Sequence, residues 1–257
     1  MIAKTNWAHV ASELTKAIGL SRQPVGIKLL RSAAEFDSWD VEDARAATYY
    51  CAAVKQASNG RAFKLGPEQF RCESSRQILG LEALPHEPYY SASYSECGLH
   101  RDKHVSGGVV GDMAVVPRTV LGIVVQPVAL FTDRGPDVVI VMGNAYQSMR
   151  MMQGYTFHQG EVPALRSVGQ HGICSESTAE PILSGTLNVS LLCSGTRFYA
   201  KWDDDEVATS LPGSLFAVTV DGVLQTINPC EPDSRKREIA LDPPDADIEL
   251  GSSYFIE

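Results

Sequence analysis

The chain has 257 residues, a formal net charge of −9 and 44% hydrophobic residues, which is enough apolar material for one large domain or two small ones. The acidic balance argues against a nucleic-acid partner, because no basic stripe offsets it. The apolar runs are too short to span a membrane, and the N-terminus lacks the apolar region and cleavage site of a secretory signal. These features predict a cytoplasmic protein.

The first half of the chain alternates between helical and extended patterns. We expect a helix over 4–19 that stops at Gly19, a strand over 25–30, a loop or short helix over 31–47, a helix over 52–58, extended chain over 61–71 and a helix over 73–83. Segment 84–112 is the least regular and is rich in Tyr, Ser, His and Gly. It is therefore expected to form a mobile loop over an active site.

The second half begins with β-branched runs that indicate strands buried on both faces. We expect strands over 114–128 and 137–142, a helix over 145–153 capped by Asn144, a buried strand over 186–192, a helix from Glu206 capped by residues 203–205, and a helix over 214–227. Together these elements predict an α+β fold, or a mixed-sheet α/β fold, in one compact domain over 1–227. The tail over 228–257, rich in Pro and Asp, is expected to be irregular.

Two stretches of the chain share one pattern, which is a strand, a cysteine, a helix-like run, a glycine stop, an extended run, a second cysteine and an arginine four residues later. Its members are Cys51, Cys72 and Arg76 in the first unit, around 24–83, and Cys174, Cys193 and Arg197 in the second, around 137–200. We interpret the pattern as a duplication. A pseudo-twofold arrangement would bring four thiols and two guanidinium groups to one place.

The cysteines of a cytoplasmic chain are not a disulfide framework, because that compartment is reducing. Cys51, Cys72 and Cys174 precede apparent helix starts, where free N–H groups and a partial positive charge favour the thiolate. The spacing excludes zinc ribbons and bacterial ferredoxin loops, whereas dispersed cysteines can still hold an iron–sulfur cluster. Three interpretations stay open: a cluster or other metal, metal-free reactive thiols, and buried structural cysteines.

A second group of chemically active residues lies in the irregular segment. Cys97, His100 and His104 have a spacing that could hold a metal through mixed sulfur and nitrogen ligands. Alternatively, either histidine could supply acid–base chemistry beside the thiols. A solvated polar loop explains the same composition and is the simpler interpretation.

Five segments carry a family resemblance. They are PVGIKLL (24–30), CAAVKQA (51–57), the region around Cys72 with GLE (80–82), DVVIVMGNAYQSMRMMQG (137–154) and GICSESTAEPILSGTLNVSLLCSGTRF (172–198). With them, residues 20–225 resemble the bacterial and archaeal family called domain of unknown function 169. The resemblance implies a cytosolic single-domain protein whose cysteines are functional, and it supplies no reaction.

From these observations we expect a cysteine-ligated metalloprotein, an enzyme with an iron–sulfur cluster of the 4Fe-4S type that acts as an oxidoreductase or lyase. Cys51, Cys72, Cys174 and Cys193 would bind the cluster, and Arg76 and Arg197 would orient a small anionic substrate for redox or Lewis-acid chemistry. His100 and His104 are the expected acid–base groups. The alternatives are a non-catalytic metal, cluster or ligand-binding module, and a metal-free enzyme with a cysteine nucleophile. Any of these could be a homo-oligomer.

Overall fold

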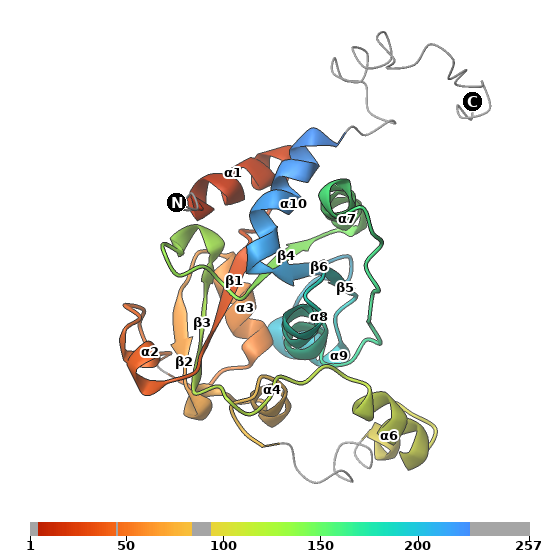
Figure 1. Cartoon of the computed structure of the whole chain (residues 1–257). Helices are drawn as coiled ribbons and strands as arrows, with labels where there is room; N and C mark the ends of the chain where they lie inside the picture. Colours follow the sequence, from red (N-terminus) through yellow and green to blue (C-terminus); the bar gives the residue numbers. More distant parts are fainter. Residues whose placement is uncertain (1–4, 45, 84–93, 227–257) are drawn as a thin grey trace, which may run out of the picture. The chain divides into compact units, whose positions relative to one another are not determined.

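A six-stranded antiparallel sheet forms the centre of the structure, with the strand order β2-β3-β1-β4-β6-β5 (Figure 1). The computed structural model describes residues 5–44, 46–83 and 94–226. The strands are β1 (Val25–Leu30), β2 (Phe63–Leu65), β3 (Gly122–Pro127), β4 (Val138–Gly143), β5 (Asn188–Ser190) and β6 (Val207–Pro212). The expected α+β fold is confirmed, in a main unit that runs from Met1 to Leu224.

Helices surround this sheet. They are α1 (Trp7–Ile18), α2 (Ala33–Asp37), α3 (Tyr50–Ser58), α4 (Glu73–Ile78), α6 (Lys103–Gly111), α7 (Ala145–Gln159), the π-helix η3 (Gly172–Ala179), α8 (Glu180–Ser184), α9 (Ser194–Ala200) and α10 (Gly213–Gln225). Two short 3₁₀ turns, η1 (Pro67–Gln69) and η2 (Val128–Leu130), follow β2 and β3. Among the described residues, no helix combines the length and the apolar character needed to cross a membrane.

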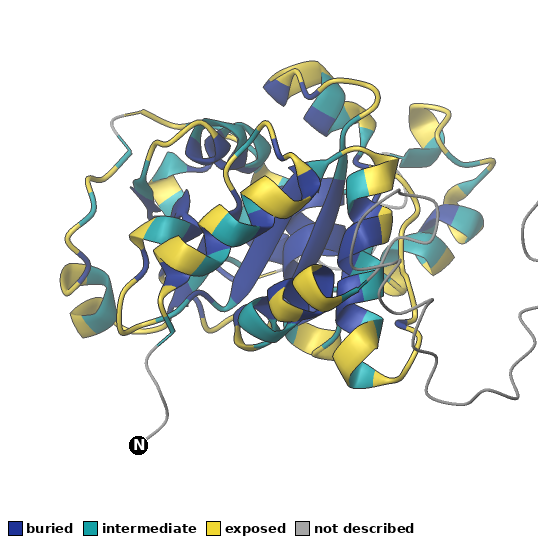
Figure 2. Ribbon diagram, turned by 90° about the horizontal axis from the view of Figure 1, so that it is seen from above, coloured by how far each residue is buried: buried dark blue, intermediate teal, exposed yellow. Residues whose placement is uncertain are grey.

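Both faces of the sheet are covered, as the continuous apolar strands predicted. Alternate residues of a strand point to opposite faces, and the buried residues accordingly form two clusters. One cluster joins Ile27, Ile123 and Ile140 of the sheet to Val54 of α3 and Ile173 of η3. The other joins the opposite face to helices α1, α7 and α10 through Leu14, Met151 and Phe216. Figure 2 shows the buried strands between the helical layers.

The two halves of the main unit have the same order of elements. The first runs β1, α2, α3, β2, α4, β3, and the second runs β4, α7, η3 with α8, β5, α9, β6. The first half also carries an extra segment with α6 between α4 and β3. Exchanging β1 with β4, β2 with β5 and β3 with β6 leaves the strand order of the sheet unchanged. This topology agrees with a duplication, and common descent of the two halves stays a prediction.

Several expected elements differ from the structure. The helix from Glu206 is wrong, because residues 207–212 form β6, which pairs with both β4 and β5. The strand over 114–128 is confined to β3, and the expected irregular character of 84–112 is wrong for α6. That helix forms despite its glycines, since the carboxylate of Asp102 accepts a hydrogen bond from Val105 N at 2.9 Å and caps it. Residues 84–93 and the tail over 228–257 lie outside the described residues.

Candidate functional site

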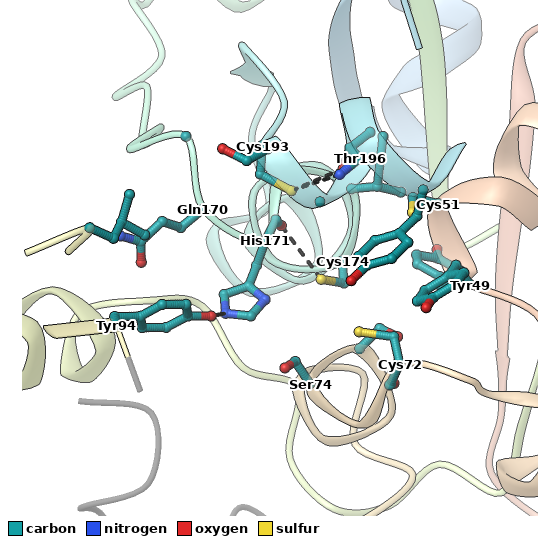
Figure 3. A pocket seen from close by; sticks show the side chains of 18 residues that line it. Tyr49, Cys51, Cys72, Ser74, Tyr94, Gln170, His171, Cys174, Cys193 and Thr196 are labelled. Atoms are coloured by element: carbon teal, nitrogen blue, oxygen red, sulfur yellow. Dashed lines mark hydrogen bonds between the residues drawn. The ribbon is translucent and has the colours of Figure 1, made fainter. Parts of the chain in front are cut away.

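Four cysteines from both halves line one cavity of about 270 Å³ (Figure 3). They are Cys51, Cys72, Cys174 and Cys193, the members that the repeated pattern grouped. The remaining lining is tyrosine, serine, glycine and aliphatic residues with Gln170, His171 and Thr196. Within the part of the chain that the structure describes, no Asp, Glu, Lys or Arg lines this cavity.

In the first half, the two cysteines stand at the starts of consecutive helices. Cys51 lies in the first turn of α3, and Cys72 is the N-cap residue of α4. Helix α3 is tied to the second half by Tyr50, whose Oη lies 3.0 Å from Thr178 Oγ1 of η3. The side chain of Tyr50 is 1% exposed, so this hydrogen bond is shielded from water and fixes the distance between the halves.

In the second half, Cys193 occupies the position equivalent to Cys72. It is the N-cap residue of α9, and its Sγ accepts a hydrogen bond from Thr196 N at 3.4 Å. Cys174 is the third residue of η3, and its thiol donates to His171 O at 3.6 Å. π-Helices are rare and occur frequently at functional sites. Neither the π geometry nor the cap at Cys193 was predicted from the sequence.

The buried carboxylate of Glu176 organises the chain beside the cavity. It accepts hydrogen bonds from Val168 N at 2.7 Å, Gly169 N at 3.0 Å and Ser167 Oγ at 2.9 Å. Ser190 Oγ on β5 also donates to it. The glutamate of the Cys-Ser-Glu motif therefore holds residues 167–170 in place, and two of these residues, Gly169 and Gln170, line the thiol cavity.

His171 lines the same cavity and was not singled out from the sequence. Its backbone is left-handed, with φ of 50°, which is uncommon for a residue other than glycine. Its Nε2 is hydrogen-bonded to the hydroxyl of Tyr94. Burial lowers the pKa of His171 to about 4, so its imidazole is neutral at physiological pH. The one feature of the sequence that pointed to His171 is its position three residues before Cys174.

Burial dominates the electrostatics of the thiols. It raises the pKa of Cys51 to about 12, with further contributions from Cys193 and Cys72, and raises the pKa of Cys174 well above its ordinary value. The expectation that helix starts would lower the pKa is therefore wrong for these two cysteines. The loss of hydration outweighs the favourable backbone N–H groups, so both groups are protonated in the metal-free protein.

The two repeat arginines are not among the residues that line the cavity. Arg76 forms an ion pair with Glu82. Arg197 donates to the carbonyl oxygens of Leu191 at 3.2 Å and Glu206 at 2.9 Å. Their identical offsets from the cysteines thus place them in contacts that hold neighbouring chain segments, and the expected pair of anion-binding groups beside the thiols has no geometric support.

The Cys97, His100 and His104 group does not line the thiol cavity either. Cys97 and His104 are exposed, and His100 is half-buried. His100 Nδ1 lies 2.7 Å from Ser106 Oγ, and its Nε2 lies 2.6 Å from Gln170 Nε2. His100 therefore touches the cavity wall only through Gln170. Among the described residues, no group of three or more His, Cys, Asp or Glu side chains is arranged to hold a metal ion.

Comparisons with known proteins give a family without a known activity. The model of the family domain of unknown function 169, described as uncharacterised ArCR, matches residues 13–222. The chain is 22% identical over 219 residues to the uncharacterised protein MJ0308 of Methanocaldococcus jannaschii, across 83% of this chain and 91% of that protein. No solved structure matches. The chain belongs to the family domain of unknown function 169.

Proposed function

We propose that the four-thiol cavity binds an iron–sulfur cluster of the 4Fe-4S type. One observation carries the proposal: four cysteines that are far apart in sequence, two from each half, line a single cavity without a charged side chain among its described lining. Cysteine thiolates are the usual protein ligands of such clusters. A cytoplasmic, reducing location would keep these thiols available.

The size of the cavity favours a group of several atoms over one ion. The cavity of about 270 Å³ is much larger than the roughly 30 Å³ that a water molecule takes in the liquid. A single ion needs its ligands within direct bonding distance, and no described group is arranged in that way. Thiolates around a cluster stand farther apart, because the cluster fills the space between them.

The electrostatics of the thiols favour a cationic group as their partner. Ionised Cys51 would be repelled by ionised Cys193 and Cys72 in a place with little hydration. Iron ions would compensate these charges, and binding would release the thiol protons. The same raised pKa disfavours the alternative of a metal-free cysteine nucleophile, which requires a thiolate near neutral pH.

A bound cluster supplies redox or Lewis-acid chemistry to a small molecule. The chain itself contributes a neutral imidazole, His171, whose orientation is set by Tyr94. Tyr49 lies on the other side of the cavity (Figure 3). Its ring stacks on that of Tyr199, with the ring centroids 4.2 Å apart. On this basis we propose a role as an oxidoreductase or lyase.

Anaerobic purification with iron and sulfide analysis tests the proposal. The wild-type protein should be coloured, with broad visible absorption and iron in stoichiometric amounts. Cys174→Ser and Cys72→Ser should each lose most of the iron, one from each half. Cys97→Ser is the matched control, because Cys97 is exposed and does not line the cavity. Equal iron content in all three variants would refute thiol ligation.

Two other outcomes identify the alternatives. A colourless protein with stoichiometric zinc that depends on the same cysteines would indicate a non-catalytic metal-binding module. A colourless, metal-free protein in which one of the four cavity thiols is alkylated rapidly at neutral pH, faster than exposed Cys97, would indicate a cysteine nucleophile. Both results would exclude the cluster, since an iron–sulfur protein prepared without oxygen retains iron and colour.

A further inference from the structure

The four cavity thiols differ in the hydrogen bonds that reach their sulfur atoms. Thr196 Oγ1 of α9 lies 3.0 Å from Cys193 Sγ, and Thr196 N donates to the same sulfur at 3.4 Å. In Figure 3 a dashed line joins Thr196 to the sulfur of Cys193. Among the described residues, Cys193 is the one cavity thiol whose sulfur has a side-chain partner, since none is hydrogen-bonded to the sulfurs of Cys51, Cys72 and Cys174.

The hydroxyl of Thr196 is buried at the cavity wall. Thr196 is the third residue of α9, lines the cavity and is 2% exposed. Water has little access to such a group, so its hydroxyl must find a partner within the protein. Among the described residues that partner is Cys193 Sγ. The low polarity of buried surroundings makes a hydrogen bond of this kind stronger than it would be in water.

The ionisation state of Cys193 decides the direction of this hydrogen bond. In the thiol form either atom can donate. A cysteine that binds a metal has lost its proton, so its sulfur can only accept and the hydroxyl of Thr196 must donate. The sulfur of a metal-bound Cys193 would then accept from both the O–H and the N–H of Thr196. Hydrogen bonds to an ionised acceptor are the stronger kind.

The equivalent residue of the first half is used differently. Ser75 stands three residues after Cys72, as Thr196 stands three residues after Cys193. Ser75 is also buried and lines the cavity, but its hydroxyl donates to the backbone oxygen of Cys72 at 2.9 Å. Both halves therefore have a buried hydroxyl at this position, and only the second half directs it at a sulfur.

We infer that Thr196 is a positioning residue that raises the reduction potential of the cluster, by donating its hydroxyl hydrogen to the sulfur of Cys193. This inference rests on the proposed function. Reduction adds one electron and hence one negative charge, while no bond is made or broken and the hydroxyl hydrogen stays on Thr196. The donor stabilises the added charge, because hydrogen bonds to the sulfurs are among the features that set the potential of a cluster.

Thr196→Val tests the inference, because valine has about the size of threonine, lacks the hydroxyl and keeps the backbone N–H. The anaerobically purified full chain is titrated with dithionite, which supplies the electrons, and visible absorption reports the reduced fraction. At a fixed ambient potential the ratio of reduced to oxidised cluster should fall about tenfold, which is about 59 mV for a one-electron couple. Thr196→Ser keeps the hydroxyl and should keep the wild-type ratio. An unchanged ratio in Thr196→Val, or an equal fall in Thr196→Ser, would overturn the inference.

A matched variant in the first half tests whether the contact with sulfur is what matters. Ser75→Ala removes a buried hydroxyl from the same cavity, but one that donates to a backbone oxygen. It should change the ratio of reduced to oxidised cluster less than Thr196→Val does. An equal fall would mean that the potential responds to the polarity of the cavity in general, and would overturn the role of the contact between Thr196 and Cys193.

Iron analysis of the same samples separates this inference from the proposed function. Wild-type protein that contains iron, with an unchanged potential in Thr196→Val, supports the cluster and refutes the inference, whereas iron-free wild-type protein refutes both. Thr196→Ala removes the same hydroxyl, so the test does not depend on the folding of one variant. Loss of iron from both hydroxyl-free variants, with iron retained in Thr196→Ser, would show that the hydroxyl is needed for assembly and would overturn its role in the potential.

Discussion

The two halves of the main unit present equivalent cysteines but hold them by different means. In the first half, Cys51 lies in a regular α-helix, and no Asp or Glu is buried among the described residues that precede it. In the second half, Cys174 lies in a π-helix that is anchored by Glu176, two residues further on. The residue two positions after Cys51 is Ala53, a core residue that is 0% exposed.

This difference shows that the same order of elements can hold a cysteine at the cavity in two different ways. Apolar packing of α3 against the sheet suffices to place Cys51 and, through the next helix, Cys72. The second half instead uses a buried carboxylate to hold residues 167–170, of which Gly169 and Gln170 line the cavity. The second half is therefore the one that places polar side chains, those of Gln170 and His171, beside its thiols.

The reactivity of the thiols gives the largest expected effect. In the metal-free protein, iodoacetamide should modify exposed Cys97 first, then half-buried Cys51, and Cys174 last. Burial raises the pKa of Cys51 to about 12. At any pH below that value, raising the pH by one unit therefore increases the thiolate fraction about tenfold. Raising the pH by about two units should speed its modification roughly a hundredfold, as followed by peptide mass spectrometry. A rate that does not change with pH would contradict the buried, protonated thiol.

Removal of the anchor should break the second half selectively. Glu176→Ala removes the acceptor of the N–H groups of Val168 and Gly169 and of the buried hydroxyl of Ser190, and it should lower the free energy of unfolding by about 3 kcal/mol. Glu73→Ala in the first half is the control, because Glu73 is exposed and its loss should cost less than about 0.5 kcal/mol. Urea unfolding of both variants measures the difference. Similar losses would mean that Glu176 is no anchor.

Close packing of η3 against the start of α9 gives the next largest effect. A Cβ at Gly172 would lie 2.6 Å from Leu192 Cα, whereas at Gly195 the nearest side-chain atom, Tyr199 Cδ2, is 3.8 Å away. Gly172→Ala should therefore destabilise the protein by about 2 kcal/mol. Gly195→Ala, inside α9, should be neutral or stabilising by up to about 1 kcal/mol. Thermal unfolding distinguishes the signs, and two equal shifts would contradict the tight contact.

The helices that follow β1 and β4 give the smallest effect. Asn144 caps α7 by accepting from Gln147 N at 2.9 Å, and Ser32 caps α2 by accepting from Glu35 N at 3.1 Å. Helix α7 buries several residues and α2 buries none. Asn144→Ala should cost about 1 kcal/mol in urea unfolding. Ser32→Ala should cost only a few tenths of that, because α2 can fray without exposing core. A larger loss at Ser32 would overturn this ranking.

Local signals in the sequence identified the elements whose stability is local. The runs around β1 and β4 are continuous and apolar, and the cap at Asn144 depends on a side chain and a backbone group three residues apart. The repeated cysteine pattern likewise grouped the four residues that line the cavity. Such a pattern is enough to group the four cysteines, because the strand order of the sheet is symmetric and brings corresponding positions of the two halves together.

Contacts between distant parts of the chain decided the features that the sequence patterns did not predict. Strand β6 exists because β4 and β5 flank it, although acidic residues 203–205 suggested a helix cap. The arginines turn to partners that only the folded chain supplies, and burial raises the pKa of Cys51 although its position at a helix start suggested the opposite. His171 and Gln170 likewise line the cavity because of contacts between distant parts of the chain. Their neighbours on the cavity wall, Tyr94 and His100, lie some 70 residues or more away in the chain, and no local pattern encodes contacts over that distance.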